Sequence, residues 1–305
     1  MINQDFDSII DLVKTFDTEE KCVEHLEALR WNWRVVSPFD SNSKVYKCTH
    51  HKYRCKNTGK YFNVKTGTMF DNTKLELQKR FMAIWLVTGH KKGISSLQLS
   101  RDLNITQKSA WFMLQRIREC FGISDGGDLE GEVEVDETYV GGKNKNRHPH
   151  KKVKQSQGRS TKDKTPVVGM IERGWNVIAK KVEDVQGSTL TREIVLHVKK
   201  SASVFTDEWL GYNAIGRIYD HSIVKHCFGE YVNGSIHTNT IEGFWSLLKR
   251  WITGIYHFVS RRHLQRYLDE FVFRYNSRKL SEAERFNMLL SQCGVHLTYN
   301  QLING

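Results

Sequence analysis

Apolar residues recur at helical spacing near the start of the chain and then give way to short alternating runs. Within residues 1–30 they lie three or four positions apart, which predicts one or two short amphipathic helices. Residues 31–73 contain the short aromatic segments "KVYKC", "KYRC" and "KYFNV", separated by turn residues such as those at 57–59. Aromatic, β-favouring runs bounded by turns indicate a small β-hairpin module.

The pattern becomes helical again between residues 75 and 121. Residues 75–87, 94–103 and 106–121 each have one apolar face, and Thr106 stands where a helix N-cap is expected. The predicted buried stripe of the last helix consists of Ala110, Met113, Leu114, Ile117 and Phe121. The side chains predicted to point away from it are Gln107, Lys108, Gln115, Arg116 and Arg118. Two helices joined by a tight turn, the second polar and basic, are typical of a helix-turn-helix that enters the DNA major groove. An ordinary helical hairpin is the alternative.

From residue 128 onward the pattern predicts an α/β domain. "GEVEVDETYV" alternates like a strand, and "PVVGMIER" and "NVIAKKVED" predict a hairpin around residues 174–175. "TLTREIVLHVKK" has helical spacing, "ASVFT" is a short apolar strand, and the chain is helical again from Thr240. Three strands, a helix, a strand and further helices favour a mixed sheet covered by helices.

A basic insert interrupts this domain at residues 143–165. It holds nine Lys or Arg, one acid and almost nothing apolar, so it belongs on the surface. Its candidates for contacting DNA phosphates are Lys143, Lys145, Lys151, Lys152 and Lys154. A merely solvated loop is the alternative.

The charge of the whole chain points to a polyanionic partner. There are 46 Lys and Arg against 34 Asp and Glu, a formal net charge of +12, which favours nucleic acid over the weaker alternative of a membrane surface. No run approaches the length of an apolar membrane span, and the N-terminus has acids where a signal peptide needs bases. We therefore expect a cytoplasmic protein.

The six scattered cysteines are typical of free thiols in a reducing compartment. Only Cys48 and Cys55 lie near each other, and with His50 or His51 they could supply three zinc ligands. No second close pair completes a zinc site, and surface histidines on a basic loop are the ordinary alternative.

Three acids suggest a metal site. Asp136 ends one β run, Asp207 ends another, and Glu242 lies in the first turn of a predicted helix. Acids at the ends of neighbouring strands repel each other unless a cation neutralises them. Oxygen ligands of this kind suit Mg²⁺ or Mn²⁺, and two such ions could drive an in-line phosphoryl transfer. Lys249 would then be placed to hold a DNA phosphate or a terminal base. The alternative is that each acid is simply exposed.

At these residues the chain resembles bacterial insertion-sequence transposases of the ISXO2-like group. "VEVDETYVGGK", "VFTDEWLGY" and "HTNTIEGFWSLLKR", followed by "HLQRYLDEFVFRYN", look like the catalytic blocks of that family. "TGTMFDNTKLELQKRF" and "KKGISSLQLSRDLNITQKSAWFMLQRIR" resemble the segments that precede the catalytic domain. The resemblance covers nearly the whole chain, and its motifs are long and in the right order.

The resemblance implies an RNase H-like domain with an Asp-Asp-Glu (DDE) site. It implies that Asp136, Asp207 and Glu242 are the catalytic, metal-binding residues, with Lys249 as the basic residue that follows the glutamate. Some relatives place Asn or His where others have the third acid, so Asn239 is a secondary candidate. Glu137, beside Asp136, is a further supporting candidate.

One segment departs from the family pattern. Many relatives carry a zinc ribbon made from two Cys-x-x-Cys knuckles, and the matching stretches here read "SPFD" at 37–40 and "CKNT" at 55–58. Only Cys55 of the four ligands remains. We expect a ribbon-shaped hairpin held by apolar packing, without structural zinc.

These observations together predict a DNA transposase that binds insertion-sequence ends and catalyses two-metal-ion strand cleavage and 3′-OH strand transfer on double-stranded DNA. The predicted domains are N-terminal helices with a degenerate zinc-ribbon-like module (1–73), a helix-turn-helix region (74–124) and an RNase H-like domain (128–296). We expect a bacterial, nucleoid-associated protein without membrane contact, assembled on DNA as a homodimer or larger. The alternatives are a domesticated, non-catalytic helix-turn-helix regulator and an RNase H-like nuclease without strand transfer.

Overall fold

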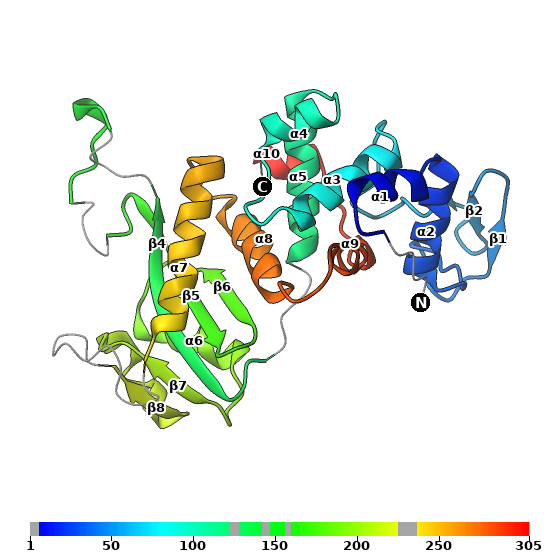
Figure 1. Cartoon of the computed structure of the whole chain (residues 1–305). Helices are drawn as coiled ribbons and strands as arrows, with labels where there is room; N and C mark the ends of the chain where they lie inside the picture. The colour runs from blue at the N-terminus through cyan, green and yellow to red at the C-terminus, as the bar shows by residue number, and fades with distance from the viewer. Residues whose placement is uncertain (1–5, 123–127, 142–146, 156–159, 225–236, 305) are drawn as a thin grey trace. The chain divides into compact units, whose positions relative to one another are not determined.

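The computed structural model describes residues 6–122, 128–141, 147–155, 160–224 and 237–304 (Figure 1). The chain forms two compact units, one from residues 1–124 and 277–305 and the other from residues 125–276. The predicted catalytic domain ran on to residue 296, whereas residues 277–305 pack with the N-terminal unit. The hydrophobic pattern marks these residues as helical but does not say which core they join.

Four helices build the core of the first unit: α1 (Ile9–Thr15), α2 (Glu19–Trp31), α3 (Leu77–Gly89) and α9 (Glu282–Ser291). Ser8 and Thr18 cap α1 and α2 as predicted by helix chemistry, each accepting a backbone N–H with its side chain. Phe286 of α9 lies 5.5 Å from the ring of Phe81 on α3, centroid to centroid. This aromatic packing explains why α9 joins the first unit.

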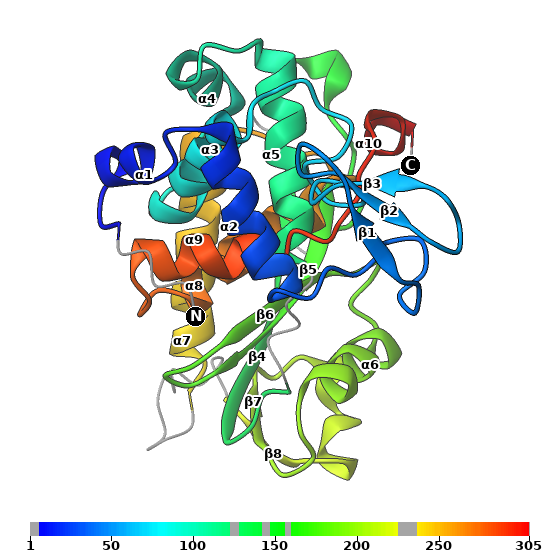
Figure 2. The same cartoon turned by 90° about the vertical axis from the view of Figure 1, so that its right-hand side faces the viewer.

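A three-stranded antiparallel sheet follows α2, in the order β1 (Val45–Lys47), β2 (Tyr53–Cys55) and β3 (Tyr61–Phe62) (Figure 2). Tyr53 and Phe62 are buried against Trp31, with ring centroids 5.2 and 6.2 Å from the indole. The alternation of the strands turns Tyr46, Arg54 and Tyr61 to the exposed face, where they are cross-strand neighbours. The small sheet is therefore held by aromatic packing on one side and is aromatic and basic on the other.

The helices α4 (Ser96–Asp102) and α5 (Gln107–Phe121) meet at a tight turn in which Asn104 has φ 49°. Thr106 caps α5, as predicted, by accepting the backbone N–H of Ser109 at 3.2 Å. The predicted stripe of α5 is buried, from Ala110 to Phe121. Gln107 and Lys108 are exposed at the beginning of the helix.

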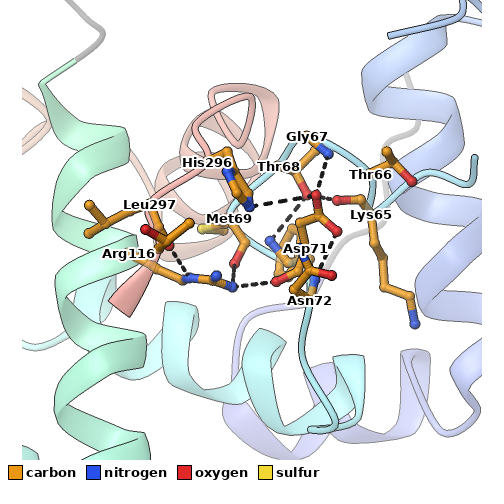
Figure 3. Close-up of polar contacts among 12 residues, drawn as sticks. Lys65, Thr66, Gly67, Thr68, Met69, Asp71, Asn72, Arg116, His296 and Leu297 are labelled. Carbon is orange, nitrogen blue, oxygen red and sulfur yellow. Dashed lines mark hydrogen bonds and ion pairs between the residues drawn. The ribbon is translucent and has the colours of Figure 1, made fainter. Parts of the chain in front are cut away.

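The predicted orientation of Gln115, Arg116 and Arg118 is wrong, because all three side chains are buried. The Arg116 guanidinium donates to the carbonyl oxygens of Leu297, Met69 and Asp71 at 2.9, 3.1 and 2.6 Å (Figure 3). Segments far from α5 in the sequence cover this face of the helix and supply acceptors for the buried charge. Arg116, predicted to bind DNA, instead ties residues 69–71 to the C-terminal segment that ends in α10 (Tyr299–Asn304).

The predicted mixed sheet is confirmed in the second unit. Its strands are β4 (Glu132–Gly141), β5 (Lys164–Glu172), β6 (Val177–Lys181), β7 (Ser203–Thr206) and β8 (Asp220–Ile223), in the order β6-β5-β4-β7-β8. The first three strands are antiparallel, and β7 and β8 run parallel to β4. β8 was not predicted from the sequence, because the strand is short and mostly polar.

Helices cover both faces of this sheet. One face packs against α7 (Asn239–Trp251) and α8 (Leu264–Asn276), and the other packs against α6 (Gly187–His197). Figure 1 shows α7 lying along β4 and β5. Gly169 of β5 permits the closest approach, since a Cβ there would stand 2.4 Å from the ring of Trp245. None of the helices in the described ranges is long and apolar enough to cross a membrane.

Candidate active site

Asp136 lies in β4 on the face that α7 covers. Its carboxylate is partly buried, and its Oδ2 accepts the indole N–H of Trp245 at 3.0 Å. Burial, then the neighbouring carboxylates of Glu137 and Asp207, raise the pKa of Asp136 to about 7. The side chain is thus held in place by a helix while being crowded by negative charge.

Asp207 follows β7 immediately. In the parallel register of β4 and β7, Glu134 stands beside Phe205, so two residues further on Asp136 meets Asp207. The backbone N–H of Trp209 donates to Asp207 Oδ1 at 3.0 Å, which fixes one oxygen of this carboxylate. The structure therefore brings the two predicted aspartates together at neighbouring strands.

Glu134 holds the N-terminus of α7, the helix that carries Glu242. It was not among the residues predicted for the site. Its fully buried carboxylate accepts the backbone N–H groups of Thr240 and Ile241, at 2.9 and 3.0 Å, and the Thr240 hydroxyl at 2.9 Å. Arg173 forms an ion pair with it at 2.7 Å, and the ring Nδ1 of His237 lies 3.1 Å from the same carboxylate. An anion at a helix N-terminus satisfies its unpaired amides and interacts favourably with its dipole. One sequence feature could have identified Glu134: it is a glutamate in a valine-rich strand, two residues before Asp136 and therefore on the same face of the sheet.

Glu242 is exposed in the first turn of α7, where the Thr238 hydroxyl donates to its Oε1 at 3.3 Å. Across the parts of the chain that the structure describes, no group of three His, Cys, Asp or Glu lies close enough to hold a metal ion. Glu242 is three residues from Trp245, one helical turn, and so shares the helix that contacts Asp136. The structure thus places Asp136 and Asp207 on neighbouring strands and Glu242 in the first turn of the helix whose Trp245 contacts Asp136.

One of the two supporting candidates, Glu137, does not face the two aspartates. Glu137 follows Asp136 in the strand and points to the opposite face of the sheet, where the buried Tyr212 hydroxyl donates to its Oε2 at 2.8 Å. Asn239 is the exposed first residue of α7, and Glu134 satisfies the amides that follow it. Glu137 was predicted to support the site because it is next to Asp136 in the sequence. Neighbouring residues of a strand point to opposite faces of the sheet, so this prediction is wrong.

Lys249 lines a cleft of about 750 Å³ that also contains Asp136. The cleft lies between the second half of β4 and the end of α7, and Lys164, Arg250 and His257 also line it. Lys249 therefore lies on the same cleft as one of the two aspartates, as its predicted phosphate-holding role requires.

The predicted DNA-binding residues are distributed over both units. Gln107 donates to the Ser96 hydroxyl at 2.9 Å, and the Lys108 ammonium lies 4.7 Å from the centroid of the Tyr299 ring. In the insert, Lys151, Lys152 and Lys154 are exposed, whereas Lys143 and Lys145 lie outside the described residues. The insert is shorter than predicted, since Lys164 already belongs to β5.

The candidate zinc residues lie in the small sheet. Cys55 is buried at the end of β2, and Cys48 is partly buried just after β1. Burial raises the pKa of the Cys55 thiol, but hydrogen bonds from Ser37, Ser43 and Thr58 outweigh it and lower the pKa to about 6. Hydroxyl groups thus surround the one sulfur that remains of the family's ligand set.

The fold and the site define the second unit as an α/β domain with paired aspartates on adjacent strands. Residues 128–276 match the family described as ISXO2-like transposase domain, which supports the resemblance seen in the sequence. The matched residues agree closely with the bounds of the second unit.

One curated relative matches most of the chain. It is described as an uncharacterized protein in transposable element ISH50 of Halobacterium salinarum, 29% identical over 277 residues that cover 86% of this chain and 92% of that protein. Among solved structures, a pre-cleavage Mos1 transpososome and the Mos1 strand transfer complex are 12% and 11% identical, and both are covered over 79% of their length. They match 70% and 72% of this chain with TM-scores of 0.27 and 0.24, too low to carry an argument.

Proposed function

We propose that the protein is a DNA transposase that cleaves DNA at the ends of its element and joins the freed 3′-hydroxyl to target DNA. The observation that carries the proposal is that Asp136 and Asp207 lie on neighbouring parallel strands of the domain that matches the transposase family, close enough for the charge of Asp207 to raise the pKa of Asp136. The strand order β6-β5-β4-β7-β8, with its antiparallel and parallel halves, supports the RNase H-like interpretation.

The transposase family implies the use of a divalent metal, and the two aspartates fit it. Carboxylate oxygens are the donors that Mg²⁺ and Mn²⁺ prefer. Burial and then the neighbouring carboxylates raise the pKa of Asp136, and a bound cation would stabilise its charged form against both. Asp136 and Asp207 would hold the metal, with Glu242 completing the set from the first turn of α7. When bound, the metal would lower the pKa of the attacking water or hydroxyl and stabilise the leaving oxygen.

The remaining site residues position these acids and the DNA. Trp245 holds Asp136 through its indole N–H, and Glu134 fixes the beginning of α7 against β4. Lys249 and Arg250 present positive charge to a phosphate in the cleft next to Asp136. Their charge favours the negatively charged transition state of phosphoryl transfer.

DNA ends would be bound by the first unit. Gln107 and Lys108 lie exposed at the N-terminus of α5, the part of a recognition helix that contacts base edges. The exposed face of the small sheet adds Arg54, whose guanidinium lies 5.7 Å from the centroid of the Tyr61 ring. Both surfaces are polar or basic, as contacts to phosphates require.

The test is cleavage of labelled DNA carrying the gene's own flanking sequence, with Mg²⁺ or Mn²⁺. Asp207→Ala should abolish cleavage, while Asp128→Ala, which removes an exposed carboxylate from the same unit, should leave it unchanged. Cleavage that survives Asp207→Ala would refute the assignment of the acids.

A second candidate is a non-catalytic DNA-binding regulator, because the exposed Gln107 and Lys108 at the beginning of α5 would serve DNA binding without catalysis. The same assay separates the two. A regulator would bind the flanking DNA with high affinity and leave it uncut with either metal.

A further inference from the structure

Phe258 is a large apolar side chain that the core does not use. Its exposed fraction is 65%, although its neighbour Val259 and the nearby Trp251 are buried at 7% and 4%. It lines the cleft of about 750 Å³ that contains Asp136. An exposed aromatic ring in a functional cleft points to a ligand rather than to folding.

The turn before Phe258 has a defined backbone conformation that side-chain contacts stabilise. The end of α7 continues into a π-helical segment (Ile252–Tyr256), a geometry frequently found at functional sites. His257 then adopts φ 58°, and its ring Nδ1 lies 3.0 Å from the carbonyl oxygen of Thr253. The Phe258 ring is therefore displayed at the end of a fixed turn.

Tyr256 anchors this turn in the core. Its ring centroid lies 5.0 Å from that of Trp251 and 4.7 Å from that of Tyr267. Its hydroxyl donates to the buried carboxylate of Glu270 at 3.4 Å. Because the residue two positions earlier is fixed, Phe258 keeps its place on the cleft without being buried itself.

Three cations also line the cleft. Lys249 and Arg250 are exposed at the end of α7, and Lys164 lines the cleft from the beginning of β5. An aromatic platform beside several cations is the combination that binds single-stranded nucleic acid, since the ring stacks on a base while the cations contact the backbone. A base in an intact duplex cannot reach such a ring without leaving its stack.

We propose that this cleft receives an unpaired terminal nucleotide of the DNA, with its base stacked on Phe258 and its phosphate near Lys249 and Arg250. This rests on the proposed function, because Asp136 then acts on a phosphodiester next to the bound nucleotide. The three cations on the wall favour a nucleotide over an apolar segment of another protein. Phe258 accordingly holds the strand end and touches no reacting bond.

The test compares binding of labelled duplexes in metal-free buffer, so that no cleavage occurs. One probe is a duplex of the flanking DNA with a short 3′ extension of thymidines, and a second carries abasic sugars in that extension. The wild-type protein should bind the first more tightly by about 5-fold to 100-fold, the range expected for one to a few kcal/mol of stacking.

Three variants sharpen the comparison. Phe258→Ala should bind both probes equally, and Phe258→Trp should keep the preference for bases. Trp175→Ala removes another exposed aromatic, 62% accessible at the β5–β6 turn, and should behave as the wild type. Thermal unfolding of Phe258→Ala should match the wild type, because the ring is outside the core.

Equal binding of the two probes by the wild type, or a preference that persists in Phe258→Ala, would overturn the proposal. A uniform loss of binding to both probes in Phe258→Ala would overturn it too, since the ring would then not be reading a base. A base preference without cleavage in Mg²⁺ or Mn²⁺ would refute the proposed function and leave this binding site standing. Cleavage without a base preference would do the reverse.

Discussion

Removing the Glu134 carboxylate should remove the hydrogen bonds that hold the N-terminus of α7 to β4, and so destabilise the second unit. In Glu134→Ala the amides of Thr240 and Ile241 lose their acceptor, and Arg173 loses a fully buried partner at 2.7 Å. Breaking a buried ion pair by truncating one partner costs about 3–5 kcal/mol. At roughly 2–4 °C for each kcal/mol, the melting temperature of this unit should fall by about 6–20 °C.

Glu132 offers a matched control on the same strand. It pairs with the same arginine at 2.6 Å, but its side chain is about half exposed, so Glu132→Ala should cost no more than about 1 kcal/mol. The assay is thermal unfolding of both variants by circular dichroism or calorimetry. Equal melting temperatures for the two variants would refute the idea that Glu134 anchors α7.

Four further predictions concern the raised pKa of Asp136, the buried Arg116, the exposed Lys108 and the number of protein copies on paired DNA ends. Because the folded pKa of Asp136 is about 7 and its ordinary value is 3.8, the metal-free protein should lose stability as pH rises from about 4 to 7, and Asp136→Asn should remove that loss in denaturant titrations. Arg116→Ala should destabilise the first unit by about 3–5 kcal/mol in urea unfolding, because three backbone carbonyls lose a buried donor. Lys108→Ala should leave stability unchanged and reduce the salt dependence of DNA binding by about one phosphate contact, measured by anisotropy at several salt concentrations. Two paired DNA ends should carry at least two copies of the protein in light scattering, and a monomeric mass on such DNA would contradict this.

The sequence predicted the mixed sheet and the helix faces well, because those depend on local hydrophobic period. The α5 stripe from Ala110 to Phe121 is buried as expected, and Thr106 caps the helix. The same reasoning failed for Arg116, since a charged residue outside the stripe was expected to meet water. Its acceptors come from residues 69–71 and 297, which no local pattern connects with α5.

The positions of site residues were predictable where the order of the strands determines them. They were not predictable where contacts between distant side chains determine them. Asp136 was predicted to end its strand, but β4 continues to Gly141, and only Asp207 follows the end of a strand. The two still come close together because β4 and β7 are parallel neighbours. Glu134 looked like an ordinary strand acid because its partners lie on a helix more than a hundred residues away. Phe258 follows a buried core helix, and only its exposed fraction separates it from the packing aromatics around it.

Strand joining is the most direct test of the claim that this chain is a transposase. A pre-cut, labelled element end with a 3′-hydroxyl is incubated with plasmid DNA and Mg²⁺ or Mn²⁺, beside the same end closed by a dideoxynucleotide. We expect joined product from the hydroxyl end alone, and none with Asp207→Ala. Nicking of DNA without joining from any end would contradict the account and identify a nuclease, and joining that persists in Asp207→Ala would show that the wrong carboxylates were named.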